Sequence, residues 1–144
     1  MKLKLCLLLI FLLFLTACGD ILVDEEPEAV DEAELVEELS VDEIEEEILF
    51  SGMGEDDLLQ SLIFEGGEIK VIIELAEDEL FSSEDMAVTR YSQASDALLI
   101  YEGWEVLTIE YTEVGVISID RSESETNELD MDYFPVDIIE QNLN

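Results

Sequence analysis

The chain has 144 residues, enough for one domain with attachments, and it carries 39 Asp and Glu against 5 Lys and Arg. Its formal net charge of -34 excludes binding to nucleic acid, because phosphate backbones would repel it. It contains no histidine and only two cysteines, so histidine-based acid-base catalysis and a cysteine-only zinc site are excluded as well.

The first residues have the organisation of an export signal. A short basic start containing Lys2 and Lys4 precedes an unbroken apolar stretch over residues 5–15. This stretch is too short for a transmembrane helix, which needs about 20 apolar residues. It is typical of the hydrophobic region of a secretory signal peptide, so we expect residues 1–17 to be removed on export.

Leu15, Thr16, Ala17 and Cys18 follow one another at the end of the apolar stretch. This order of leucine, small polar residue, alanine and cysteine resembles the lipobox of bacterial lipoproteins, over residues 1–19 only. The resemblance implies that Cys18 receives a diacylglycerol thioether and becomes the mature N-terminus after signal peptidase II cuts before it. It further implies that the lipid holds the protein on the extracytoplasmic face of a cell membrane.

The alternative interpretation is an ordinary signal peptide that happens to contain a cysteine. In both cases Cys6 lies within the removed segment, so the mature chain keeps Cys18 alone and has no disulfide. An exported domain without disulfides depends on its apolar core for stability.

Residues 18–57 are predicted to form an acidic tether. Half of the residues between Asp24 and Asp57 are Asp or Glu, and like charges at this density favour an extended, solvated chain. Apolar residues at helical spacing nevertheless predict short helices over 29–39 and 41–49, the second with a capping box from Ser40 to Glu43. The tether is either a plain spacer or an arm that captures a cationic partner or divalent ions.

The folded domain is expected over residues 58–144, and it is expected to fold alone. Residues 58–64 and 69–75 are predicted strands, and the two glycines of the turn between them indicate a hairpin. Ile69, Val71 and Ile73 alternate with Lys70 and Glu74, which is typical of a strand with one buried face.

A helix is predicted to begin after Ser82 and to end at Gly103. Its buried face is expected to contain residues spaced by three and four positions, namely Ala87, Tyr91, Ala94, Leu98 and Tyr101. Ser95 is expected on the opposite, exposed face.

A second hairpin follows, with predicted strands over 105–112 and 116–119 and a turn near Gly115. Residues 121–132 are predicted to form a polar loop, and a short last helix begins at Pro135. The order β-β-α-β-β-α predicts an α+β domain, with a small antiparallel sheet of two hairpins and helices packed on one face.

Few side chains suggest chemistry. Lys70 is the only lysine left after signal removal and is expected to be a solvated charge, so no base is available to activate a nucleophile. Arg90 and Arg121 are expected to pair with neighbouring acids, and Trp104 to lie in the core or at its rim. We therefore expect no enzymatic activity.

The acidic loop before Tyr133 is the one candidate metal site. Glu128, Asp130 and Asp132 supply carboxylate oxygens of the kind that Ca²⁺ prefers, and they are candidate ligands for a weakly bound ion. Their spacing does not match an EF-hand, and the alternative is a solvated loop with loose counter-ions. No other cofactor is expected.

Taken together, these patterns favour an extracytoplasmic bacterial lipoprotein that displays a small, non-catalytic binding domain on an acidic tether. Two alternatives remain open at this point: a small carboxylate-based surface enzyme or an accessory subunit of one, and an acidic surface protein that buffers ions. The expected partners are the membrane, through the lipid on Cys18, and a cationic protein.

Overall fold

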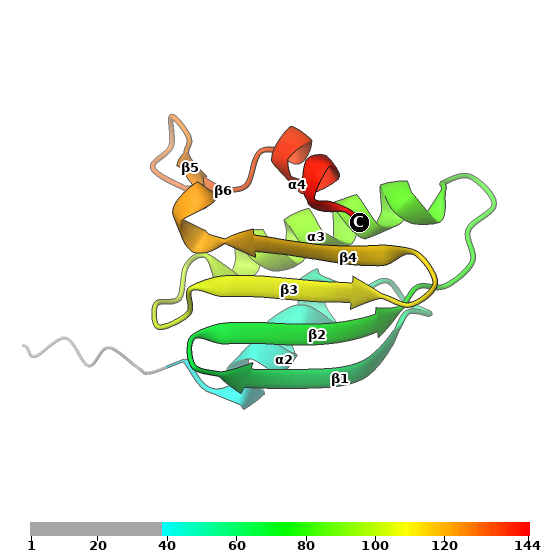
Figure 1. Cartoon of the computed structure of the whole chain (residues 1–144), viewed down its shortest axis with the longest axis horizontal. Coiled ribbons are helices and arrows are strands. Elements are labelled where there is room, and N and C mark those ends of the chain that lie inside the picture. Colours follow the sequence, from blue (N-terminus) through cyan, green and yellow to red (C-terminus); the bar gives the residue numbers. More distant parts are fainter. Residues whose placement is uncertain (1–38) are drawn as a thin grey trace, which may run out of the picture. The chain divides into compact units, whose positions relative to one another are not determined.

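The computed structural model describes residues 39–144 of the chain (Figure 1). The predicted signal peptide, Cys18 with its lipobox, and all but the last residue of the predicted helix over 29–39 lie outside this range. The elements in chain order are α2 (Val41–Ser51), β1 (Leu58–Glu65), β2 (Glu68–Glu74), α3 (Ser83–Leu98), β3 (Val106–Tyr111), β4 (Gly115–Asp120), the 3-10 turn η1 (Arg121–Glu123), β5 (Glu125–Thr126), β6 (Asp132–Tyr133) and α4 (Val136–Asn142).

Helix α2 confirms the predicted second helix and its capping box. The Ser40 hydroxyl accepts a hydrogen bond from the Glu43 N–H at 3.3 Å, and the Glu43 carboxylate accepts one from the Ser40 N–H at 2.8 Å. These bonds satisfy backbone donors that a helix leaves unpaired at its start. The Ser40 hydroxyl also donates to the Glu43 carboxylate at 2.6 Å, and this bond, together with the one from the Ser40 N–H, lowers the pKa of Glu43. Ile44 and Ile48, one helical turn apart, are fully buried.

The predicted domain boundary at residue 58 is wrong, because α2 belongs to the folded unit. The helix contacts both α3 and β1, and Ile44 and Ile48 join the same hydrophobic cluster as the sheet. Leu39, just before the helix, is buried there too. The acidic residues that suggested a solvated tether, such as Asp42 and Glu45, occupy the exposed face of α2. The two isoleucines on one face anchor the helix, although its remaining surface is mostly acidic and also exposes Leu49 and Phe50.

Strands β1 and β2 form the predicted hairpin around the two-glycine turn. Ile69, Val71 and Ile73 of β2 are buried, whereas Lys70 and Glu74 are exposed. The alternation therefore identified the core face of the sheet correctly.

Helix α3 begins where the sequence predicts. The Ser82 hydroxyl accepts a hydrogen bond from the Asp85 N–H at 3.1 Å. Four residues of the predicted buried face lie on the helix and are buried in the core, namely Ala87, Tyr91, Ala94 and Leu98. Tyr101 lies beyond the helix and is partly buried against the same core.

Two details of the α3 prediction are wrong. The helix ends at Leu98, and the chain reaches Gly103 through a turn. Ser95 is fully buried, although it was placed on the exposed face. The physical reason is that α3 contacts α2, α4 and β6 in addition to the sheet, so its buried face is wider than one stripe.

The α+β class, the two hairpins and the placement of helices against one face of the sheet are confirmed. The pairing between the hairpins differs from the prediction, because β2 and β3 run parallel, with Ile69 opposite Leu107 and Ile73 opposite Tyr111. The sheet has the order β1-β2-β3-β4 and is mixed. Helix α3 carries the chain back along the sheet, so β3 starts at the same end as β2.

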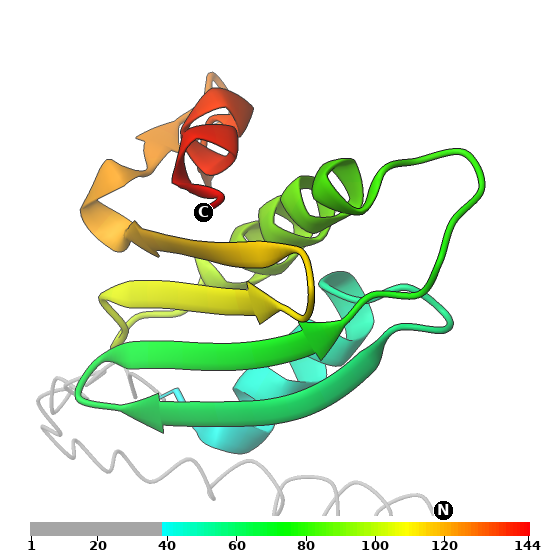
Figure 2. The same ribbon diagram turned by 45° about the vertical axis from the view of Figure 1, so that its right-hand side comes forward.

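The helices lie behind the sheet in the view of Figure 1, with α2 behind β1 and β2 and α3 crossing behind the upper strands. The 45° turn in Figure 2 shows α4 beside β4 at the edge of this layer. Ile139 of α4 is buried, whereas Val136 at the start of the helix is exposed. Pro135 is the N-cap of α4, so the helix begins at Val136, one residue later than predicted.

The C-terminus covers part of the β4 edge. Val116 donates a hydrogen bond to the carbonyl of Asn144 at 3.0 Å, and Asn144 donates one back at 3.1 Å. A Cβ atom at Gly115 would lie 2.6 Å from the Asn144 carbonyl oxygen. Glycine is therefore needed here for the close approach of the last residue.

Candidate functional site

The predicted polar loop over 121–132 contains more structure than expected. It holds the turn η1 and a small hairpin in which Glu125 pairs with Tyr133 and Thr126 with Asp132. The Asp132 carboxylate accepts a hydrogen bond from the Thr126 hydroxyl at 2.7 Å. Asp130 lies in the tip of the hairpin with a positive φ of 58°.

The predicted calcium ligands are not assembled into a metal site. Within residues 39–144, no group of three or more acidic side chains is arranged to hold a metal ion. Glu128, Asp130 and Asp132 belong to the same hairpin, but Asp132 is engaged with Thr126 across it.

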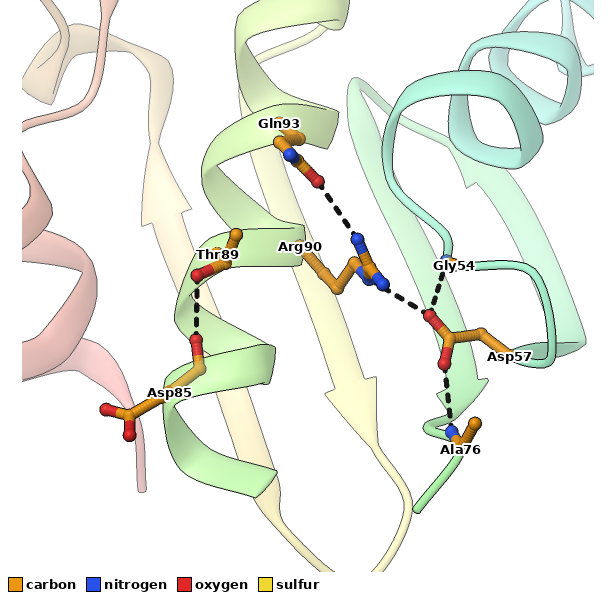
Figure 3. Close-up of polar contacts among 7 residues, drawn as sticks. All are labelled: Gly54, Asp57, Ala76, Asp85, Thr89, Arg90 and Gln93. Carbon is orange, nitrogen blue, oxygen red and sulfur yellow. Dashed lines mark hydrogen bonds and ion pairs between the residues drawn. The ribbon is translucent and has the colours of Figure 1, made fainter. Parts of the chain in front are cut away.

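The most buried charge in the described part is Asp57, which sequence reasoning did not single out. Its side chain is 3% exposed and forms an ion pair with Arg90 of α3, with 3.0 Å between Oδ2 and Nε (Figure 3). The same carboxylate accepts hydrogen bonds from the N–H of Gly54 at 2.5 Å and of Ala76 at 2.9 Å. Arg90 also donates to Gln93.

This arrangement ties three segments together. Asp57 lies just before β1, Ala76 lies just after β2, and Arg90 lies on α3. A Cβ atom at Gly54 would lie 2.2 Å from a guanidinium nitrogen of Arg90, so only glycine leaves room for the arginine. Because the buried carboxylate is neutralised by Arg90 and accepts two backbone hydrogen bonds within the fold, we interpret the cluster as structural.

Arg121 differs from its predicted role, because no carboxylate lies within ion-pair distance of it in the described residues. Its guanidinium donates to the backbone carbonyls of Leu99, at 2.9 Å, and of Tyr101. It also lies over the Trp104 ring, 4.8 Å from the centroid. These carbonyls follow the C-terminal end of α3, where the helix carries negative partial charge and has no basic residue of its own in the last turn.

A groove of about 460 Å³ lies between the end of α3 and the β5–β6 hairpin. Its volume falls within the range of small-ligand sites. Its apolar lining includes Ile100 and Met131, which are 74% and 54% exposed. The charged and polar side chains in the lining are Asp96, Glu102, Asp130, Asp132, Asn127 and Arg121.

The groove is negatively charged despite the presence of Arg121. Four carboxylates face one guanidinium, and that guanidinium is already bound to carbonyls and to Trp104. Partial burial raises the pKa of Asp96, because desolvation disfavours its charged form. A cationic group entering the groove would relieve this cost, and the exposed apolar residues would contact its hydrocarbon part.

The remaining predicted side chains are accounted for in the fold. Lys70 pairs with Glu68 at 2.8 Å on the exposed face of the sheet, and this pair lowers the pKa of Glu68. Trp104 is buried and donates its indole N–H to the Leu98 carbonyl at 2.9 Å, which confirms its place in the core.

Sequence reasoning missed the groove, because its lining comes from the end of α3, the end of β4 and the small hairpin. No helix within residues 39–144 is both long and apolar enough to cross a membrane. Comparisons of the chain with protein-family models, with curated proteins and with solved structures return no match.

Proposed function

We propose that this chain is a bacterial lipoprotein, anchored on the extracytoplasmic face of the cell membrane, that displays a small non-catalytic binding domain. The observation that carries the proposal is the uninterrupted order Leu15, Thr16, Ala17, Cys18 directly after a short apolar stretch. A diacylglycerol on Cys18 supplies two acyl chains, which is sufficient for stable residence in a membrane.

The binding partner is proposed to be a cationic protein segment that enters the groove. The support is charge complementarity between a positive side chain and the carboxylates Asp96, Glu102, Asp130 and Asp132. Ile100 and Met131 lie beside them and favour a partner in which lysine or arginine stands next to apolar residues.

The anchor is tested by labelling cells with a radioactive fatty acid. Cys18→Ala is expected to abolish labelling and leave the chain uncut, because the thiol is the acceptor of the lipid. Cys6→Ala is the matched control and should keep both labelling and processing. A Cys18→Ala protein that is still labelled, or still cut after Ala17, contradicts the lipoprotein proposal.

The groove is tested by titrating the protein with a short peptide of alternating lysine and leucine. Asp96→Asn together with Asp130→Asn should weaken binding about tenfold, which corresponds to roughly 1.4 kcal/mol. Asparagine is suitable at position 130, because it tolerates the positive φ found there. Glu110→Gln with Asp137→Asn removes the same charge away from the groove and should change affinity much less. Equal losses in both pairs would mean that the peptide responds to net charge alone.

A further inference from the structure

The two edge strands of the sheet, β1 and β4, differ in whether another segment is hydrogen-bonded to their outer side. The C-terminal residue covers β4 at Val116, whereas β1 has no described strand on its outer side, as Figure 1 shows for residues 39–144. Alternate residues of β1 therefore direct backbone N–H and C=O groups away from β2 and into solvent. An edge of this kind is a template for pairing with another strand.

The β1 edge lacks the features that usually prevent such pairing. Natural edge strands are protected by charged residues, prolines or covering loops. Residues 58–64 contain no charged side chain and no proline, although the chain has 39 Asp and Glu. Leu58 and Ile63 are 58% and 47% exposed. Residues 58–64 thus form an uncharged strip on a strongly acidic protein, and Glu65 is the one charged residue of β1.

An irregularity in the ladder limits the length of edge that can pair. The register of β1 against β2 shifts between Leu59 and Ser61, and it is regular from Ser61 to Glu65. Within this regular part Leu62 and Phe64 pack against the core, whereas Ile63 lies opposite the exposed Lys70 on the open face of the sheet.

We propose that β1 pairs with β1 of a second copy of this chain, in an antiparallel arrangement centred on Ile63. The two sheets would then form one continuous sheet across a two-fold axis. Antiparallel pairing about Ile63 places the two Ile63 side chains against each other. It also places each Glu65 opposite a Ser61, so no carboxylate faces another carboxylate.

The charge distribution favours a second copy over a cationic partner at this edge. Residues 58–64 carry no charge, so a cationic partner gains no countercharge from the strand itself and is attracted instead to acidic surfaces such as the exposed face of α2. Two copies repel each other through their acidic surfaces, including the exposed face of α2 behind β1, and the uncharged strand is where they can approach with the least repulsion. Added salt screens this repulsion and should strengthen the dimer.

The dimer is tested by sedimentation equilibrium of the chain from residue 18 onward, with Cys18→Ser to exclude the lipid. Self-association that depends on concentration and increases with salt is expected. Ile63→Lys and Ile63→Glu should each weaken it by about tenfold or more, because like charges would meet at the two-fold axis. Glu110→Gln, on the open face of the inner strand β3, is the control and should not weaken it.

The two charge changes separate strand pairing from general electrostatics. If reduced repulsion alone controlled association, Ile63→Lys would strengthen the dimer and only Ile63→Glu would weaken it. That outcome overturns the proposal, as does a wild-type chain that stays monomeric at all concentrations and salt levels. Because the lipid and the groove are not involved, failure here leaves the proposed function standing.

Hydrogen exchange of the wild-type chain provides a test that needs no variant. Backbone amides of residues 61–65 should exchange more slowly as protein concentration rises, whereas amides of β3 should not change. Protection of β1 that is independent of concentration, and that disappears when residues 18–38 are deleted, would mean that the chain's own N-terminal segment covers the edge. That result would also overturn the dimer.

Discussion

The two arginines of the folded part play different roles: Arg90 lies in the middle of α3, and Arg121 binds the carbonyls that follow its C-terminal end. Arg90 neutralises a buried carboxylate, Asp57, and so joins α3 to the segment between α2 and β1. Arg121 has no carboxylate at ion-pair distance among residues 39–144 and instead contacts carbonyls at the end of α3 and the ring of Trp104. Among so many acidic residues, Arg90 pairs with the one that is buried. A buried carboxylate needs a countercharge because water cannot solvate it.

The comparison also distinguishes a cluster that stabilises the fold from a groove that can bind a partner. Around Arg90, the Asp57 carboxylate is engaged by the guanidinium and by two backbone N–H groups, which leaves it little capacity to bind a ligand. Around Arg121, the groove is lined by four carboxylates and one guanidinium, so carboxylates are in excess. We therefore expect changes at Arg90 to act on stability, and changes around the groove to act on partner affinity.

Removing α2 together with Asp57, the partner of Arg90, should have the largest effect. A chain that starts at residue 58 lacks Ile44 and Ile48 from the core and lacks Asp57, so Arg90 loses its partner. This fragment should fail to unfold cooperatively, whereas a chain that starts at residue 39 should show a single thermal transition by circular dichroism. A cooperative transition in the shorter fragment would mean that α2 is dispensable.

Arg90→Met should be the most damaging single change in this comparison. It leaves the Asp57 carboxylate buried without a countercharge, and the loss is about 2–4 kcal/mol in the free energy of unfolding. Asp57→Asn in the same chain should recover part of that loss, because the neutral amide needs no countercharge. Denaturant unfolding of both single variants and the double variant measures the coupling. Additive effects would show that the two side chains do not interact.

Arg121→Met should cost less, about 1–3 kcal/mol, since it removes charge-assisted hydrogen bonds to carbonyls but leaves no buried charge unpaired. Arg121→Lys is the matched variant, because it keeps the charge and loses the planar group that contacts two carbonyls and a ring. The stability of Arg121→Lys should fall between those of the wild type and of Arg121→Met. An Arg121→Met protein that is destabilised as much as Arg90→Met would remove the distinction between the two arginines.

The smallest effect at neutral pH is expected at Tyr111, which faces the charges of Asp57 and Arg90. Its hydroxyl is buried without a hydrogen-bond partner, so Tyr111→Phe should change stability by less than about 1 kcal/mol at pH 7. Burial raises the pKa of Tyr111 and of Tyr91 above the usual value. Both therefore stay protonated in the folded state at pH values where unfolded tyrosines ionise.

The sign of the pH effect follows from this difference. The stabilisation is complete below about pH 10, where unfolded tyrosine is still protonated, and it is lost as the pH rises further. Urea unfolding at pH 9 and pH 11 should show a clear decrease for the wild type and a smaller one for Tyr111→Phe. Tyr133→Phe, in the exposed hairpin, should behave like the wild type. Equal pH dependence in all three proteins would contradict the assignment to Tyr111.

Local patterns in the sequence predicted most elements of the fold. The capping residues Ser40 and Ser82 fix helix starts through bonds to backbone N–H groups only three positions away. The alternation in β2 and the two-glycine turn fix a hairpin in the same local way. The predicted lipobox that ends at Cys18 is likewise a continuous pattern of residues, and it lies outside the described residues.

The sequence by itself therefore determined the helices, the strands and the α+β class, while the tertiary structure decided how they combine. Only the fold shows that α2 is part of the core, that β2 and β3 are parallel, and that Ser95 is buried. The partner of Arg90 and the groove were likewise inaccessible, because their residues come from segments far apart in the chain. Among so many acidic residues, composition gives no sign of which carboxylate is buried, since burial depends on contacts across the whole domain.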